Sequence, residues 1–330
     1  MNDAGRTLVI QIPCHNEEEV LPVVLAGLPR EVPGIARMIA LVIDDGSTDR
    51  TSEIARRHGA EVLPLPVRRG LARAFLAGLE RAVALGADVV VNTDGDNQYR
   101  GADIPRHVEP VLRGEADLVI GARPVASIKS FSPLKKLLQR LGSAATRLAS
   151  GTGIEDAPSG FRAMNRDAAM RLHVFNRYTY TVETIIQAGQ KGMAVLSIPV
   201  GVNPVTRPSR LMRSPASYVA RQLNVMVRVF MTYRPFRFFA IPGIVFGGLG
   251  AALLARFLYF YFTGDGAGHI QSVVIGSMLA ALGVLLAIVG LIADLISVNR
   301  QLLEDVDWRL RRMEQNSPLR NRSAEPTTST

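Results

Sequence analysis

Residues 87–98 read ADVVVNTDGDNQ, and this stretch decides the fold. Its first half is an apolar run typical of a strand that is buried on both faces. In its second half Asp94 and Asp96 stand one residue apart, so both carboxylates can reach one hard divalent cation, with water and a diphosphate in its other positions. Gln98 follows at the next alternate position and offers a neutral oxygen ligand. Because an Asp-x-Asp pattern is also common in surface turns, its meaning depends on the rest of the chain.

Two earlier apolar runs end in similar polar loops. The run at 7–12 leads into PCHNE at 13–17, and the run at 39–43 leads into DDGSTD at 44–49. Further runs of this kind alternate with segments of helical period, which predicts a mainly parallel sheet covered by helices on both faces, an α/β fold. Strands are predicted at 7–12, 37–43, 61–65, 88–93, 117–121 and 194–198, and helices at 17–28, 49–58, 70–85, 102–113, 133–149 and 180–191.

The loops that follow parallel strands face one crevice at the edge of the sheet. Carboxylates in these loops suit ribose hydroxyls and the N–H donors of a base, so the sequence predicts a nucleotide pocket beside a metal site. Neither a Gly-x-Gly-x-x-Gly nor a Gly-x-x-x-x-Gly-Lys-Ser/Thr loop is present, so a dinucleotide fold or a P-loop ATPase is not indicated.

Composition and charge restrict the class of protein further. Of the 330 residues 48% are hydrophobic, and the single cysteine, Cys14, excludes a disulfide framework or a cysteine-rich zinc site. The net charge of +9 requires an anionic partner. Arginines cluster at 207–237 among apolar residues, which suits an interfacial helix among lipid headgroups better than nucleic-acid binding; a solvated helix is the alternative.

Two apolar segments follow this basic stretch. Residues 238–262 carry one charge and residues 270–293 carry none, and each exceeds the roughly 20 residues that a helix needs to cross a bilayer. Because basic residues flank the outer ends of the pair, we expect a multi-pass protein of the cell membrane with both termini and the large domain in the cytoplasm. The predicted division is a catalytic domain at 1–205, a basic interfacial segment at 206–237, two spans at about 238–262 and 270–296 within 238–298, and an amphipathic helix with a disordered tail at 299–330.

Small residues form a stripe in the second span. Steps of four and three along a helix place them on one side, where they allow close helix contact within the hairpin or between protomers, so a homo-oligomer is left open. The stripe consists of Gly276, Ala280, Gly283, Ala287 and Gly290.

Four motifs in this order resemble glycosyltransferase family 2, in particular the polyprenyl-phosphate glycosyltransferases: PCHNEE, DDGSTD, TDGDNQ and SGFRAMNR at 159–166. The resemblance covers about 7–211. It implies a glycosyltransferase A-type fold, a nucleotide-sugar donor (a UDP- or GDP-hexose), Mg²⁺ or Mn²⁺, and inverting transfer to undecaprenyl or dolichyl phosphate.

The resemblance also implies roles for individual residues. Asp94, Asp96 and Gln98 would hold metal and diphosphate, and Asp94, Asp96 and Arg123 would be catalytic. The implied donor site comprises Pro13, His15, Glu17, Asp44, Asp45, Asp94, Arg207, Ser209 and Arg210. The implied acceptor site comprises Arg123, Lys135, Lys136, Ser159 and Glu183.

Two other functions fit parts of the sequence. A processive polysaccharide synthase usually carries a Gln-x-x-Arg-Trp motif before its membrane helices, whereas the only tryptophan here, Trp308, follows both spans. A non-catalytic membrane scaffold with the same fold would not need Asp94, Asp96 and Gln98, all of which are present.

Overall fold

The computed structural model describes residues 5–124, 133–174, 180–204, 227–228, 231–264 and 266–316. It contains two compact units, one made of Met1–Gln222 with Asp307–Thr330 and one made of Leu223–Val306. Most of the predicted interfacial segment at 206–237 and the predicted disordered end at 317–330 lie outside the described residues.

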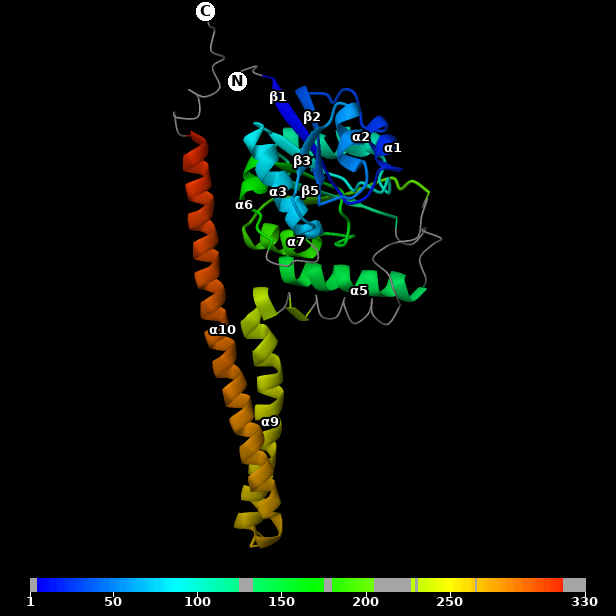
Figure 1. Ribbon diagram of the computed structural model, residues 1–330. Helices are drawn as coiled ribbons and strands as arrows, with labels where there is room; N and C mark the ends of the chain where they lie inside the picture. Colours follow the sequence, from blue (N-terminus) through cyan, green and yellow to red (C-terminus); the bar gives the residue numbers. More distant parts are fainter. Residues whose placement is uncertain are drawn as a thin grey trace, which may run out of the picture. The chain divides into compact units, whose positions relative to one another are not determined.

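The first unit is built on a seven-stranded sheet in the order β3-β2-β1-β4-β6-β5-β7 (Figure 1). All neighbouring strands are parallel except β6, which runs antiparallel to both β4 and β5. The strands are β1 Arg6–Cys14, β2 Ile35–Asp44, β3 Glu61–Pro64, β4 Val89–Asn92, β5 Leu118–Ala122, β6 Arg162–Asn165 and β7 Val195–Pro199. The central strands carry fully buried Val, Ile and Leu on both faces, as the apolar runs predict.

Helices cover both faces of this sheet. One core cluster joins the sheet to α1, α2 and α4, and a second joins it to α3, α6 and α7. These helices are α1 Leu21–Ala26, α2 Thr51–Arg57, α3 Leu71–Ala84, α4 Ile104–Leu112, α6 Arg166–Arg171 and α7 Thr181–Gln190; the 3₁₀ turn η1 (Gly101–Asp103) precedes α4, and α5 (Pro133–Ser150) lies beside α7.

The structure differs from the sequence expectations at three places. Strand β6 and helix α6 are not among the predicted elements, because their sequences, RAMN and RDAAMR, show neither an apolar run nor a clear hydrophobic period. Helix α1 begins at Leu21 instead of residue 17, since the backbone N–H groups of Glu17 and Glu18 donate to Thr51, the first residue of α2, and to Asp49 in the loop before it.

The second unit is a helical hairpin. Helix α9 (Pro235–Phe262) and the apolar part of α10 (Ile270–Asn316) run side by side in Figure 1, joined by the 3₁₀ turn η2 (Gly266–His269). A Cβ on Gly250 would lie 2.5 Å from the backbone of Ala280, and one on Gly283 would lie 2.7 Å from Gly243. The small-residue stripe therefore packs within the hairpin.

Both helices of this hairpin are apolar and long enough to cross a membrane. The residues after 299 are helical as expected, and they form the C-terminal part of α10, which continues without a break to Asn316. From Asp307 onward α10 belongs to the first unit, where Trp308 Nε1 donates to Asp167 (3.2 Å) and His173 contacts Asp307 (2.9 Å).

Phe75 of α3 provides a test of the core on one face of the sheet. Its ring is fully buried and stacks on Tyr180 with 3.9 Å between centroids. We expect Phe75→Ala to destabilise the first unit by about 3–5 kcal/mol, because it removes a stacked ring and leaves a cavity. Thermal unfolding in detergent measures the loss, and Val67→Ala, at a residue 62% exposed, is the control that should unfold like the unmodified chain.

Candidate active site

Three strand-end loops meet at one edge of the sheet. Strands β2, β1 and β4 are adjacent and parallel, with Cys14 paired to Asp44 and Gln11 to Asn92. Hydrogen bonds join the first two loops directly, for example from Asn16 N to Ser47 Oγ (3.0 Å). The third loop packs on the first so closely that a Cβ on Gly95 would lie 2.7 Å from Cys14 Sγ. The three loops therefore meet at one edge of the sheet, as the sequence predicts.

The loop after β4 presents the two aspartates differently. Asp96 is exposed, and its Oδ1 accepts from the backbone N–H of Gln98 (3.1 Å), which tightens the turn. Asn97 has a φ of 60°, a left-handed conformation that asparagine tolerates better than most residues. Asp94 is partly buried. The loop therefore holds one carboxylate inside the site and one at its mouth.

The pKa of Asp94 is raised to about 7: burial is the largest cause and the charge of Asp96 adds to it, whereas Arg123 and Arg162 act in the opposite direction. Because burial and Asp96 oppose the negative charge of Asp94, a cation bound between the two aspartates would stabilise that charge. This pair therefore fits a divalent metal ion. Within the described ranges no group of three or more His, Cys, Asp or Glu side chains is placed to hold a metal. Neutral oxygens such as that of Gln98, together with water and substrate, would complete the coordination.

Gly160 sets the position of Asp94. A Cβ at residue 160 would lie 2.7 Å from Asp94 Oδ1, so the carboxylate rests directly on the glycine Cα. The glycine itself is fixed: its N–H donates to Tyr99 Oη (2.9 Å), and its carbonyl accepts from Asn92 Nδ2 (2.8 Å) and Tyr180 Oη (3.3 Å). The lack of a side chain at this position makes room for the Asp94 carboxylate.

The buried guanidinium of Arg162 holds the backbone next to Gly160. Arg162 is 0% exposed, and its Nη2 donates to the carbonyls of Ser159 (3.0 Å) and Thr181 (2.7 Å). Among the described residues it makes no ion pair with a carboxylate, and burial lowers its pKa to about 10. Arg162 thus ties the segment that leads into Gly160 to the start of α7.

The residues predicted to bind the acceptor phosphate differ in their contacts and burial. Arg123 follows β5, and its Nε and Nη2 bind the two carboxylate oxygens of Asp156 at 2.7 and 3.1 Å. Ser159 is fully buried, and its hydroxyl contacts Tyr99 Oη (3.3 Å). Glu183 is buried in the first turn of α7. Lys135 lies in the first turn of α5, but its side chain and that of Lys136 are outside the described part of the structure.

Asp44 and Asp45, which are predicted to bind the nucleotide-sugar donor, hold the loops together. The Asp44 carboxylate accepts from Ser47 N (2.8 Å) and also contacts Ser52 Oγ. The Asp45 carboxylate accepts from the N–H groups of Arg69 (2.6 Å) and Gly70 (2.8 Å), which draws the loop before α3 to the site. These bonds engage both carboxylate oxygens of Asp44 and both of Asp45.

The other predicted donor residues fall into two groups. Pro13 is buried, whereas His15 and Glu17 are partly exposed beside it, and His15 Nδ1 contacts the carbonyl of Asp45 (3.0 Å). Arg207, Ser209 and Arg210 lie outside the described residues.

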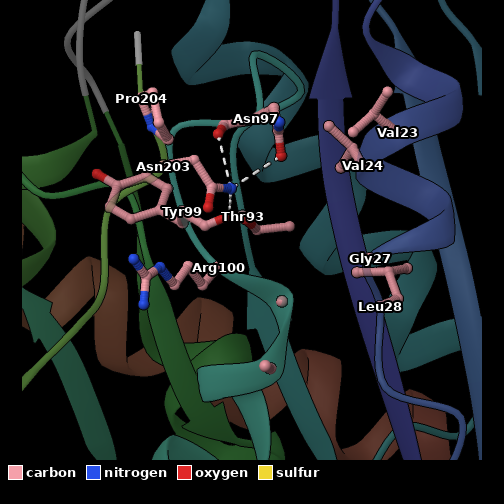
Figure 2. A pocket seen from close by; sticks show the side chains of 12 residues that line it. Val23, Val24, Gly27, Leu28, Thr93, Asn97, Tyr99, Arg100, Asn203 and Pro204 are labelled. Atoms are coloured by element: carbon pink, nitrogen blue, oxygen red, sulfur yellow. Dashed lines mark hydrogen bonds between the residues drawn. The ribbon is translucent and has the colours of Figure 1, made fainter.

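A pocket of about 470 Å³ borders the same loop (Figure 2). One wall comes from α1, with Val23 and Val24, and the opposite wall includes Asn97 and Asn203. Asn203 points toward Asn97 and donates to its carbonyl (3.1 Å) and side-chain oxygen (3.0 Å). The segment after β7 therefore holds the loop after β4 in place.

Sequence reasoning missed several residues that position the site. Asn203 and Asn92 carry no local pattern that distinguishes them from other asparagines. Tyr99 is buried among core residues, and its hydroxyl also fixes Gly160. The SGFR segment was identified as part of a motif. Its arginine, Arg162, is fully buried, so the motif alone does not indicate its role.

The sequence of this chain is similar to those of known glycosyltransferases. A family model described as "Glycosyl transferase family 2" matches residues 9–172. An undecaprenyl-phosphate mannosyltransferase of Micrococcus luteus is 31% identical over 206 residues, 59% of this chain and 82% of that protein. A UDP-N-acetylglucosamine–dolichyl-phosphate N-acetylglucosaminyltransferase of Methanococcus voltae is 27% identical over 220 residues, 60% of this chain and 86% of that protein.

A solved structure shares the fold of the first unit. Glucosyl-3-phosphoglycerate synthase from Mycobacterium tuberculosis, in complex with Mn²⁺ and UDP-glucose, superposes with a TM-score of 0.53 at 25% identity, over 69% of this chain and 79% of that chain. The chain belongs to glycosyltransferase family 2. It is a glycosyltransferase with a type-A fold, and its two apolar helices associate it with a membrane.

Gly160→Ala tests whether this glycine sets the metal site. The added methyl group must displace the Asp94 carboxylate, so we expect the affinity for Mn²⁺ to fall about 10–100-fold, as for other changes behind a metal ligand. Electron paramagnetic resonance of free Mn²⁺ during titration of the purified chain measures this. Gly153→Ala is the matched control, because a Cβ there meets nothing within 4 Å. Equal affinity in both variants, with unchanged thermal unfolding, would contradict the assignment.

Cys14 provides a second test. Its side chain is buried, and burial followed by the charge of Glu17 raises the thiol pKa well above its usual value. We therefore expect no alkylation of the native chain by a maleimide at pH 8 and complete alkylation after denaturation. Intact-protein mass spectrometry counts the modified thiols, and rapid reaction of the native chain would show that the loops open.

Proposed function

We propose that the protein transfers a hexose from a UDP- or GDP-sugar to a polyprenyl phosphate, with inversion at the anomeric carbon. The observation that carries this proposal is the convergence of the loops after β1, β2 and β4 on Asp94 and Asp96, in a chain that also has two apolar helices. A soluble donor and a membrane-bound acceptor are the pair of substrates that such a chain can bring together.

The donor would lie along the crevice. Pro13, His15 and Glu17 would contact the base and ribose together with the second strand-end loop, whose carboxylates Asp44 and Asp45 fix its shape. Asp94 and Asp96 with Gln98 would hold Mg²⁺ or Mn²⁺ near the diphosphate. When bound there, the ion supplies neutralising charge for the departing nucleoside diphosphate. Arg207, Ser209 and Arg210 are proposed to close over the donor phosphates.

The acceptor needs little activation. A phosphate monoester has a second pKa of about 6, so near pH 7 it is largely a dianion and already nucleophilic. One of its oxygens would form the new bond to the anomeric carbon as the bond from that carbon to the diphosphate breaks on the opposite face. The task of the protein is alignment and charge neutralisation.

Arg123 is the cation best placed for the acceptor phosphate. Asp156 takes its Nε and Nη2, and within the described residues its Nη1 has no hydrogen-bond partner. A guanidinium oriented in this way is preorganised to bind an incoming anion. Lys135 and Lys136 would add charge at the start of α5, and Ser159 and Glu183 complete the proposed acceptor side.

The reaction is proposed to occur at the cytoplasmic face of the cell membrane. Basic residues flank the outer ends of the two apolar helices, and by the positive-inside rule this supports a cytoplasmic location for both termini and the catalytic unit. Nucleotide sugars and polyprenyl phosphates would meet there.

Asp96→Ala tests the proposed function. We expect transfer to fall by at least about 10²-fold, because an exposed metal ligand is lost while no core contact is removed. The purified chain in detergent is incubated with labelled UDP-glucose, UDP-N-acetylglucosamine or GDP-mannose and with undecaprenyl or dolichyl phosphate. The lipid product is then extracted and counted.

Glu53→Ala, in the exposed ion pair with Arg57, is the control and should transfer normally. Normal turnover of Asp96→Ala would refute the metal assignment. A long polysaccharide product would favour a processive synthase, and intact Mn²⁺ binding without transfer from any donor would favour a scaffold.

A further inference from the structure

The segment that follows β7 runs antiparallel to residues 97–100 of the loop after β4. Tyr99 and Val202 form the bridge between the two segments. Asn203 comes next and precedes Pro204, and a residue before proline favours extended backbone. In Figure 2 the side chain of Asn203 points toward the loop after β4.

Asn203 donates to three consecutive carbonyl groups of this loop. Its side-chain Nδ2 donates to the carbonyls of Asn97 (3.1 Å) and Tyr99 (3.3 Å), and its backbone N–H donates to the carbonyl of Gln98 (2.9 Å). Because a backbone carbonyl can only accept, the atom of the side-chain amide that faces these oxygens must be the nitrogen. One asparagine thus fixes the orientation of three successive peptide groups.

One of these peptide groups connects Asn203 to a predicted metal ligand. The peptide group between Asn97 and Gln98 accepts from Asn203 through its carbonyl and donates through its N–H to Asp96 Oδ1 (3.1 Å). Hydrogen bonds in series through one peptide group strengthen one another. Among the described residues no group donates to Asp96 Oδ2, so this oxygen is open to a cation. The carboxylate therefore takes its orientation from a chain of hydrogen bonds that begins at Asn203.

The backbone at Asn97 needs this support. Its φ of 60° lies in the left-handed region, which costs free energy for a residue with a Cβ, although asparagine tolerates it better than most. Asn203 Nδ2 holds both the carbonyl (3.1 Å) and the side-chain oxygen (3.0 Å) of Asn97 in this conformation. Loss of these bonds would favour relaxation toward negative φ, and that change rotates the peptide group that donates to Asp96.

The segment that carries Asn203 is itself held in place. The N–H of Gly201 donates to Asp103 Oδ2 (2.6 Å), and a Cβ on Gly201 would lie 2.6 Å from Arg100 Cδ. Before this segment, β7 pairs along its length with the buried strand β5. Asn203 therefore projects from a fixed part of the first unit, as a residue that orients a neighbouring loop must do.

We propose that Asn203 is a positioning residue for the metal site, which holds the loop after β4 in the conformation that presents Asp96 and Gln98 to one divalent cation. The inference rests on the proposed role of these two residues as metal ligands. Asn203 acts through the peptide group between Asn97 and Gln98 and does not touch the ion. Its removal should therefore weaken metal binding more than it weakens the fold.

The test measures binding of Mn²⁺ to the purified full chain in detergent, by electron paramagnetic resonance of free Mn²⁺. Asn203 is half-buried, so its truncation leaves the core intact. We expect Asn203→Ala to lower the affinity for Mn²⁺ about 10-fold, as for other residues that orient metal ligands. Thermal unfolding of each variant shows that it is folded at the temperature of the titration.

Asn165→Ala is the matched control. The side chain of Asn165 also joins separate parts of the chain, since it donates to Asp117 (2.7 Å) and accepts from the N–H of Ala168 (2.7 Å). It lies beside Val89, at the end of β4 remote from Asp94. We expect Asn165→Ala to unfold at a lower temperature and to bind Mn²⁺ like the unmodified chain.

Asn97→Gly gives a readout that a merely structural role would not move. Glycine adopts a positive φ without a steric penalty, so adding Asn203→Ala to Asn97→Gly should lower the affinity for Mn²⁺ only about threefold or less. The two substitutions are thus expected to be non-additive. An equal loss of affinity in both backgrounds would overturn the role of Asn203 in holding the left-handed turn.

Asp96→Ala, titrated in the same way, separates the two levels of the argument. Weaker Mn²⁺ binding by Asp96→Ala, together with unchanged binding by Asn203→Ala, would overturn the role of Asn203 and leave the metal assignment standing. Unchanged binding by both variants would overturn the metal assignment and the role of Asn203 together. Weaker binding by both, with Asn165→Ala unaffected, is the expected result.

Discussion

The arrangement of the site depends on one electrostatic conflict. Asp94 is partly buried next to Asp96, and both burial and the second carboxylate oppose its negative charge. Arg123 and Arg162 act in the opposite sense, but each is committed elsewhere, one to Asp156 and the other to backbone carbonyls. The protein thus holds the two aspartates together at a free-energy cost that a cation would relieve. Gly160 adds the steric part of the same constraint, because it lets the carboxylate approach the sheet without meeting a side chain.

The sheet and its active edge could be predicted because their causes are local. Apolar runs bounded by turns define each parallel strand, and parallel strands bring their carboxyl ends to one side whatever their exact order. The six predicted strands are all present. The paired aspartates after β4 could be recognised for the same reason, since strand direction and alternate spacing determine where they point. The small-residue stripe likewise predicted close helix packing, although only the structure shows that its partner is α9.

The supporting residues could not be predicted, because their roles arise from long-range contacts. Asn92 and Gly160 are separated by 68 positions, and Asn203 reaches Asn97 across 106. The antiparallel strand β6 brings Gly160 next to Asp94, yet its sequence, RAMN, contains no apolar run that would predict a strand. The ion pair between Arg123 and Asp156 also changes how the arginine is understood. It is a cation already oriented by a carboxylate, with one edge turned away from it.

Helix α5 shows why hydrophobic periodicity identifies a helix without deciding which face is buried. Its leucines recur at helical spacing, and on an ordinary domain such a stripe would pack on the core. Here the adjoining surface near α7 presents backbone N–H groups and a glycine, so Ser143 and Ser150 satisfy it better than leucine would. The polar groups of the first unit thereby determine which face of α5 is buried.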